Sequence, residues 1–176
     1  MYKSRFKILA AGAILAVAGI GITRALTAPL TQASGHGTLF VTNSDGQQVR
    51  RQFSLSGRKN PDGTVKGNAV LHNPAFTVDN GQNYMLQIDI SCMNVVGNTV
   101  FFGGTTKRTN DPTLVDAVFF SVEDNGEPGA GSDKISQAMF WDDDPTTTGD
   151  PMACLNNVAG DFEMLPIESG NIQVRL

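Results

Sequence analysis

Hydrophobic and polar side chains alternate with a period of two along most of the chain after residue 34. The clearest runs are Phe53–Ser56, Val65–Leu71, Leu86–Cys92, Val118–Glu123 and Ile172–Leu176. Successive side chains of a strand point to opposite faces of a sheet, so each run has one buried face and one wetter face. The pattern predicts antiparallel strands that pack one face against a core.

Turn-forming sequences separate these runs. Asn60–Gly63 predicts a hairpin turn, because proline presets φ and glycine adopts positive φ without steric cost. Val96–Asn98, Asp124–Gly129 and Ser169–Asn171 mark further turns. We expect about eight strands. They should lie near residues 37–43, 50–58, 64–72, 84–95, 99–108, 114–124, 134–141 and 171–176, with a further short strand near 161–165.

Short connections favour a meander, in which strands adjacent in the sequence pair with each other. Tilted antiparallel strands of this number can close into a barrel. We therefore predict an all-β fold, an antiparallel meander that forms a closed or partly closed barrel. A two-sheet sandwich is the alternative.

The first 33 residues have the layout of a secretory signal peptide. Lys3, Arg5 and Lys7 precede the uncharged run Ile8–Ile22, and a small-residue region ends at Ala33. We expect cleavage after Ala33, which leaves a single domain over residues 34–176 in the periplasm or outside the cell. The alternative is an uncleaved membrane anchor, although Ile8–Ile22 is shorter than the ~20 residues that span a bilayer.

Removal of this leader makes the chain more acidic. The full sequence has 13 Lys and Arg residues and 17 Asp and Glu residues, and the leader contains Lys3, Arg5, Lys7 and Arg24 but no acidic residue. The remainder has 13 − 4 = 9 basic and 17 acidic residues, a net charge of −8. Such a surface repels nucleic acid and anionic lipid. We expect no nucleic-acid partner and no stable membrane span after cleavage, and a protein or envelope partner is compatible with these features.

The two cysteines, Cys92 and Cys154, are expected to form a disulfide. An even number of cysteines in an exported chain indicates pairing, and the alternation puts Cys92 on the inward face of its strand. The bridge would tie the long polar segment Trp141–Cys154 to the sheet, and two buried free thiols are the alternative. A cysteine nucleophile would need a positioned base, and His36 and His72 are the only histidines.

Two acidic clusters are candidate calcium sites. Asp124, Glu127 and Asp133 lie in a glycine-rich turn, and Asp142 and Asp144 lie in the long segment before the second cysteine. Calcium prefers six to eight oxygen ligands, which such turns can supply. The spacing differs from the D-x-[DN]-x-[DN]-G loop, however, and turn formation alone also explains Asp-Asn-Gly. No sequence motif indicates a catalytic site, so we expect no cofactor and no enzyme activity.

Adjacent aromatic residues put large apolar side chains on both faces of the expected sheet. The pairs are Phe101-Phe102, Phe119-Phe120 and Phe140-Trp141. The second apolar face is either covered within the domain or free to contact a partner or line a ligand cavity.

Four fragments resemble a group of exported bacterial all-β domains of the post-COAP-1 kind. They are Asn60–Gly67 (N-P-D-G-x-V-x-G), Val96–Val100 (a G-N hairpin), Val122–Gly129 (V-x-D-N-G-E-P-G) and Gly170–Val174 (G-N-I-Q). The similarity extends over Phe53–Val174 and implies a secreted β-domain without a defined activity. The chain departs from the group in its long Asp/Pro/Thr segment and in its cysteine pair.

We therefore expect a secreted or cell-envelope β-domain that is not an enzyme and acts as a structural or macromolecular-interaction module. A β-barrel that binds a small apolar ligand is the alternative, and it requires an internal cavity of ~300 Å³ or more.

Overall fold

The computed structural model describes residues 30–42, 46–77, 83–111, 116–140, 149–157, 160 and 163–176, with the backbone alone for 73–77, 83 and 84. These residues form one antiparallel sheet and the short 3-10 helix η1 (Pro151–Asn156). The strands are β1 (Thr31–Thr42), β2 (Gln48–Lys59), β3 (Val65–Thr77), β4 (Asn83–Val96), β5 (Thr99–Thr109), β6 (Ala117–Glu123), β7 (Lys134–Ser136), β8 (Met139–Phe140), β9 (Met164–Pro166) and β10 (Ser169–Arg175). Within the described residues, no helix is both long and apolar enough to cross a bilayer.

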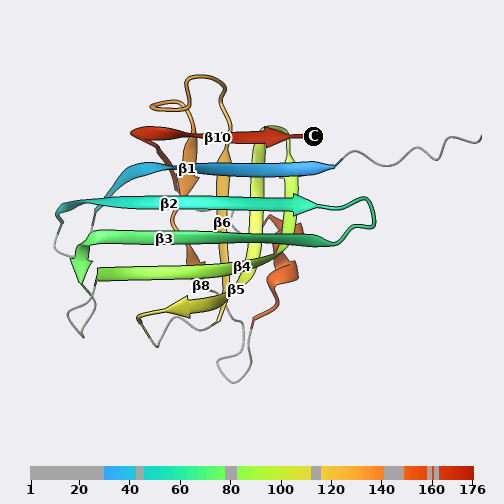
Figure 1. The fold of residues 1–176 in the computed structure, drawn as a ribbon, viewed down its shortest axis with the longest axis horizontal. Helices are drawn as coiled ribbons and strands as arrows, with labels where there is room; N and C mark the ends of the chain where they lie inside the picture. Colours follow the sequence, from blue (N-terminus) through green and yellow to red (C-terminus); the bar gives the residue numbers. More distant parts are fainter. Residues whose placement is uncertain are drawn as a thin grey trace, which may run out of the picture.

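The sheet is a meander that curls into a half-barrel, so the predicted fold class is confirmed. The strand order is β10-β1-β2-β3-β4-β5-β6-β7-β9, and β8 pairs with β6. Figure 1 shows β10, β1, β2 and β3 as one wall, across which β6 runs nearly at right angles. The long strands β4 and β5 bend from one wall to the other. A single continuous sheet therefore replaces the two separate sheets of the sandwich alternative.

Several strand boundaries differ from those expected. β1 begins at Thr31, three residues before the expected start of the mature chain, and Ala33 is only 1% exposed. Its neighbour Gln32 is paired on both sides, with Arg58 of β2 and with Arg175 of β10. The strand expected at 134–141 is divided into β7 and β8, and the short strand expected near 161–165 is β9.

The inner face of the curled sheet holds the main core. Its buried side chains come from β1 to β7, from β10 and from the link before β10. Phe102 and Phe120 stack at its centre with ring centroids 5.0 Å apart. Phe102 reaches the opposite wall, where a Cβ atom built on Gly57 would lie 2.6 Å from its ring. The interior between the walls is therefore filled by side chains along this line.

A second, smaller cluster lies on the outside of the other wall. It joins Cys92, Phe101, Ala117, Phe119 and Cys154, and η1 covers it. A register shift between Ile90 and Cys92 marks a β-bulge in β4. The bulge inverts the alternation, so the prediction that Cys92 shares the inward face with Ile90 is wrong. The second apolar face predicted from the aromatic pairs is confirmed for Phe101 and Phe119, which are covered within the domain, whereas Trp141 lies outside the described residues.

The predicted hairpin turn joins β2 to β3. The Gly63 amide donates to the Asn60 carbonyl at 2.9 Å, and Gly63 has a φ of 85°. Asp62 accepts hydrogen bonds from the Thr64 hydroxyl at 2.6 Å and from the Thr64 amide at 2.9 Å. These bonds, the hydroxyl first, lower the pKa of the exposed Asp62 carboxyl.

The start of β1 generates a first prediction. A chain that begins at Ser34 loses Thr31, Gln32 and the buried Ala33 from a strand that is paired on both sides. Loss of ~2 kcal/mol of pairing and burial should lower the melting temperature by about 5 °C relative to a chain that begins at Thr31. Thermal unfolding followed by circular dichroism measures the difference. Equal melting temperatures would show that these three residues add nothing to the sheet, and N-terminal sequencing of the exported protein would show whether it keeps them.

Candidate functional site

Side chains that point away from the core on β10, β1, β2, β3, β4 and β5 form a broad polar surface, which we call the outer face. Its members include Gln32, Ser34, His36 and Thr38 of β1, Arg50, Gln52, Ser54, Ser56 and Arg58 of β2, Lys66, Asn68 and His72 of β3, Gln87 and Asp89 of β4, Thr105 and Lys107 of β5, and Gln173 and Arg175 of β10. Phe40, Val70 and Met85 are its apolar members. Unlike the outside of the other wall, this surface has no described element packed across it.

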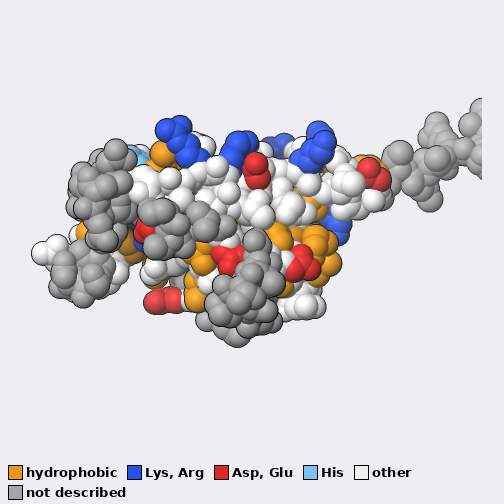
Figure 2. Space-filling view, turned by 90° about the horizontal axis from the view of Figure 1, so that it is seen from below, with side chains coloured by type: hydrophobic (Ala, Val, Ile, Leu, Met, Phe, Trp, Pro, Cys, Tyr) orange, Lys and Arg blue, Asp and Glu red, His pale blue; other side chains and the backbone are white. Residues whose placement is uncertain are grey.

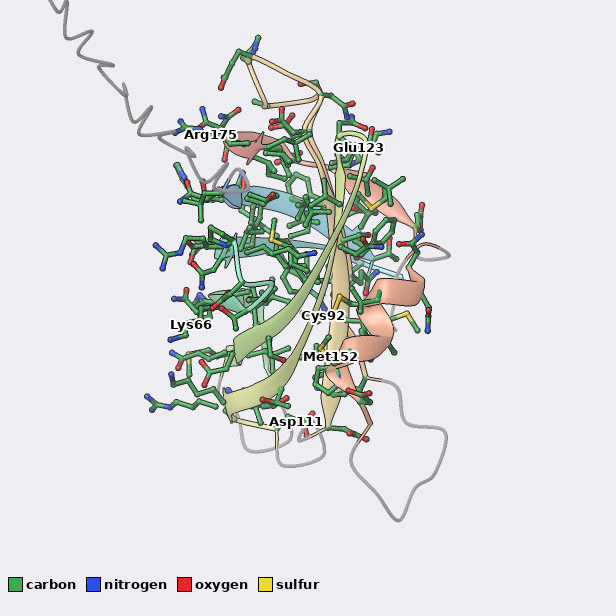
Figure 3. The ribbon with its side chains drawn as sticks, turned by 90° about the vertical axis from the view of Figure 1, so that its right-hand side faces the viewer. Lys66, Cys92, Asp111, Glu123, Met152 and Arg175 are labelled. Atoms are coloured by element: carbon green, nitrogen blue, oxygen red, sulfur yellow. A yellow bond between two sulfur atoms is a disulfide. The ribbon has the colours of Figure 1, made fainter. Side chains whose placement is uncertain are left out.

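Strand register brings basic residues into one line across the outer face. Gln32 of β1 pairs with Arg175 of β10 on one side and with Arg58 of β2 on the other, and Arg58 pairs with Lys66 of β3. We call Arg175, Gln32, Arg58 and Lys66 the basic row. Neighbouring strands lie ~4.8 Å apart, so three cations fall within about three strand spacings. Figure 3 shows Arg175 and Lys66 pointing to the same side of the molecule, away from Cys92 and Met152.

Arg58 and Lys66 are like charges that lie directly opposite each other. Such cross-strand pairs are destabilising in a sheet. Three other described cations form ion pairs with carboxylates within 4 Å, whereas none is formed by Arg58 or Lys66, although Lys66 lies near enough to Asp62 to help lower the pKa of that carboxyl. The three ion pairs are Lys107–Asp89 at 3.0 Å, Lys134–Glu123 at 3.5 Å and Arg50–Glu168 at 3.8 Å. Folding alone gives no reason to place two cations directly opposite each other, and such local conflicts are typical of functional sites.

A groove of about 620 Å³ runs along this part of the outer face. Polar side chains line it, and Ala33, Gly57 and Gly67 contribute to its floor. Its polar lining side chains are Gln32, Ser34, Ser56, Arg58, Lys66, Asn68, Asp89 and Lys107, and we call this hollow the basic groove. A second hollow of about 370 Å³ lies beside His72 and Met85 and is not basic.

The basic groove contrasts with the charge of the whole chain. The full sequence has a net charge of −4, and most described acidic side chains lie away from the outer face, in the loops around β6, β7 and η1. Figure 2 shows Lys and Arg gathered along one side of the molecule, with most of the visible Asp and Glu below them. The net charge therefore averages two surfaces of opposite sign.

The acidic turn, residues 124–133, has a structural role that the sequence did not reveal. Asp133 is fully buried and accepts hydrogen bonds from the amides of Ile172 at 2.7 Å and Asn125 at 2.8 Å. Asp124 accepts from the amide of Val174 at 2.8 Å and from that of Gly126 at 3.0 Å. The two carboxylates thus bind the free edge of β10, opposite the edge that pairs with β1.

Glu127, the third candidate ligand in this turn, also binds β10. Its carboxylate accepts from the side-chain amides of Asn171 at 2.8 Å and Gln173 at 3.2 Å. Asp142 and Asp144, the candidates of the second cluster, lie outside the described residues. Within the described part of the chain, no three His, Cys, Asp or Glu side chains are grouped closely enough to hold a metal ion. Hydrogen bonding to β10 accounts for the described carboxylates of the acidic turn without a cation.

The predicted disulfide is present. Cys92 of β4 and Cys154 of η1 are bonded, with Cα atoms 6.1 Å apart. The Asp150 side chain caps η1 by accepting from the Met152 amide at 2.9 Å. Gly103 of β5 allows close contact, because a Cβ atom there would overlap the Pro151 carbonyl oxygen. The bridge and the glycine together hold η1 over the second cluster.

The basic groove was not predicted from the sequence. Its cations, Arg58, Lys66 and Lys107, are distributed over β2, β3 and β5, and only the strand pairing brings them together. The available signal was that Arg58, Lys66 and Arg175 all occupy the polar positions of alternating runs. The expected net charge of −8 pointed instead to a uniformly acidic surface.

Comparison with known proteins finds no relative of this chain. No family model, no curated protein and no solved structure matches the chain. The resemblance to post-COAP-1 domains stays a prediction, although the described structure gives its Asp-Asn-Gly-Glu-Pro-Gly turn a physical role in holding β10.

The acidic turn generates a second prediction. Asp133→Ala leaves the Ile172 amide without its acceptor at a buried site, which should cost about 1–3 kcal/mol. Chemical denaturation should show this loss, whereas Glu163→Ala, a change at an exposed carboxylate, should leave stability within ~0.5 kcal/mol. Millimolar calcium should not raise the melting temperature through this turn, because the described carboxylates already accept N–H donors. A calcium-dependent rise that Asp124→Asn and Asp133→Asn abolish would contradict this assignment.

The disulfide generates a third prediction. It joins residues 62 positions apart, and closing a loop of this size is worth ~4 kcal/mol in the chain-entropy account. The double variant Cys92→Ala/Cys154→Ala should lose most of that stability in urea unfolding. Because η1 is then held by fewer bonds, limited proteolysis should cut the variant first around η1. Unchanged stability and an unchanged cleavage pattern would show that the bridge is dispensable for holding η1.

Proposed function

We propose that this protein is an exported, non-enzymatic β-domain that holds a macromolecular partner of the cell envelope in the basic groove of its outer face. The observation that carries the proposal is the Arg58–Lys66 pair, two cations directly opposite each other on neighbouring strands, neither of which forms a described ion pair within 4 Å. An anionic partner would relieve their mutual repulsion. The groove is lined by residues of five strands, β1 to β5, and is long enough to accept an extended molecule.

Two features support an exported location. The leader has the charge and hydrophobicity pattern of a signal peptide. The Cys92–Cys154 disulfide is consistent with an oxidising compartment. Export is therefore the compartment that best fits the chain, and it would bring the outer face into contact with envelope components.

Two other routes to interaction are occupied within the domain, although Met152 and Leu155 of η1 remain exposed. Strand addition at β10 is blocked because the Ile172 and Val174 amides already donate to the acidic turn. The second apolar face, with Phe101 and Phe119, lies under η1. The apolar-ligand alternative has less support, because Phe102 fills the space between the two walls as far as Gly57. The outer face is thus a described surface that no element of the domain covers.

A sedimentation experiment tests this proposal. Purified protein is mixed with envelope fragments of the producing cells and centrifuged, and the bound fraction is measured for the wild type and for the variant Arg58→Gln/Lys66→Gln. We expect the wild type to sediment with the fragments and the variant to remain mostly in solution, because each lost charge-assisted contact should weaken binding about tenfold.

The matched control removes two charges outside the basic groove. Arg50→Gln/Lys134→Gln changes the net charge by the same amount at residues that do not line the groove. It should sediment like the wild type. Equal sedimentation of all three proteins, or none by any of them, would rule out the basic groove as an envelope-binding surface.

A further inference from the structure

We infer that the ligand of the basic groove is a linear polysaccharide that carries carboxylate or sulfate groups, an inference that rests on the function proposed above. The chain of such a polymer would lie across the strands, from Gln32 on β1 towards Lys107 on β5, with Arg175 of the basic row just beyond the lining of the groove. Three observations point to this class of ligand. They are the spacing of the cations, the row of polar side chains beside them, and the absence of aromatic and large apolar side chains from the described lining of the groove.

The cations are arranged for an extended anion rather than for a compact one. Arg175 and Arg58 are separated by Gln32, and Lys66 follows on the next strand. A pyranose ring advances a polymer by nearly the distance between neighbouring strands, so acidic sugars along one chain can meet successive cations of the row. Arginine binds carboxylate and sulfate groups through two parallel N–H bonds, which suits repeated planar or tetrahedral anions.

Hydroxyl and amide side chains lie in a second row beside the cations. The register pairs Ser34 with Ser56, and Ser56 with Asn68. These groups both donate and accept hydrogen bonds, as do sugar hydroxyls. Asn68 pairs in turn with Asp89, whose carboxylate holds Lys107 at 3.0 Å. The basic groove therefore offers a line of positive charge with a parallel line of neutral polar groups, which matches an acidic sugar that has charges and hydroxyls on each ring.

The lining argues against two other anionic partners. Single-stranded nucleic acid is held by stacking of bases on aromatic side chains, and no aromatic residue is among the described lining of the groove. A membrane surface is bound by apolar side chains that enter the lipid, and Ala33 is the only apolar residue in that lining. The negative charge of the remaining surface also repels large polyanions such as duplex DNA or anionic vesicles, whereas a single narrow chain can follow the basic groove.

Binding to defined polymers tests the inference. Wild-type protein is titrated by calorimetry with polygalacturonate, which carries carboxylates, with dextran sulfate, which carries sulfates, and with neutral dextran. A thymidine oligonucleotide and phosphatidylglycerol vesicles are the competing probes. We expect binding to at least one acidic polysaccharide at low salt, weakening as NaCl is raised, and none to neutral dextran. The acidic polysaccharide that binds identifies the anionic group.

Two variants locate the binding site. Arg58→Gln/Lys66→Gln should weaken binding about a hundredfold, since each hydrogen-bonded cation contributes about tenfold. Arg50→Gln/Lys134→Gln should stay within about twofold of the wild type, because those charges act only through the screened long-range field. Asn68→Ala removes no charge and should weaken binding about fivefold through the lost neutral hydrogen bonds. Melting curves of all variants verify that each is folded.

Several results would overturn the inference. They are failure to bind either acidic polysaccharide, equal or tighter binding to the oligonucleotide or the vesicles, and an equal loss in the groove and control variants. If envelope sedimentation still depended on Arg58 and Lys66 while both polysaccharides failed to bind, the polysaccharide inference would be wrong and the proposed function would stand. If sedimentation failed and polysaccharide binding succeeded, the choice of an envelope partner would be wrong instead.

Discussion

Two carboxylates hold the last strand of the sheet in place. β10 pairs with β1 on one side only, and on its other side the Ile172 and Val174 amides donate to Asp133 and Asp124. Further backbone bonds tie the same turn to the link before β10, since the Gly131 amide donates to the Ile167 carbonyl at 2.7 Å. Side-chain oxygens thus take the place of a neighbouring strand, and the edge is protected from pairing with another chain.

The position of β10 determines the surface proposed to bind a ligand. Arg175 becomes part of the basic row only because β10 is aligned with β1, which puts Arg175 opposite Gln32. The packing of the two walls and of η1 also depends on close contacts at two glycines. Gly57 receives the Phe102 ring on the inside, and Gly103 receives η1 on the outside. Added side chains at either glycine would separate layers that the disulfide and the core hold together.

The sequence predicted the regular parts of this structure and missed those that depend on long-range pairing. Alternation in runs such as Leu86–Ile90 was sufficient to predict an antiparallel half-barrel, because one face of each strand must be buried. The same rule failed at Cys92, since a bulge adds one residue and no composition signal marks it. The disulfide could be predicted from the even number of cysteines together with the export expected from the leader. The hairpin turn at Asn60–Gly63 could be predicted because its geometry is local.

The candidate site was predicted poorly for the same reason. Asp124 and Asp133 were interpreted as possible calcium ligands, because a carboxylate-rich turn does not show which distant amides it will meet. Arg58 and Lys66 became a site only when register placed them side by side.

The pairing of the first strand with the last has a further consequence for the order of events in biosynthesis. Thr38 and Ser169, bonded across β1 and β10, are 131 residues apart, so one side of β1 waits unpaired until nearly the whole domain has been synthesised. A chain built this way can form its local hairpins early, but its sheet is complete only once β10 has been synthesised.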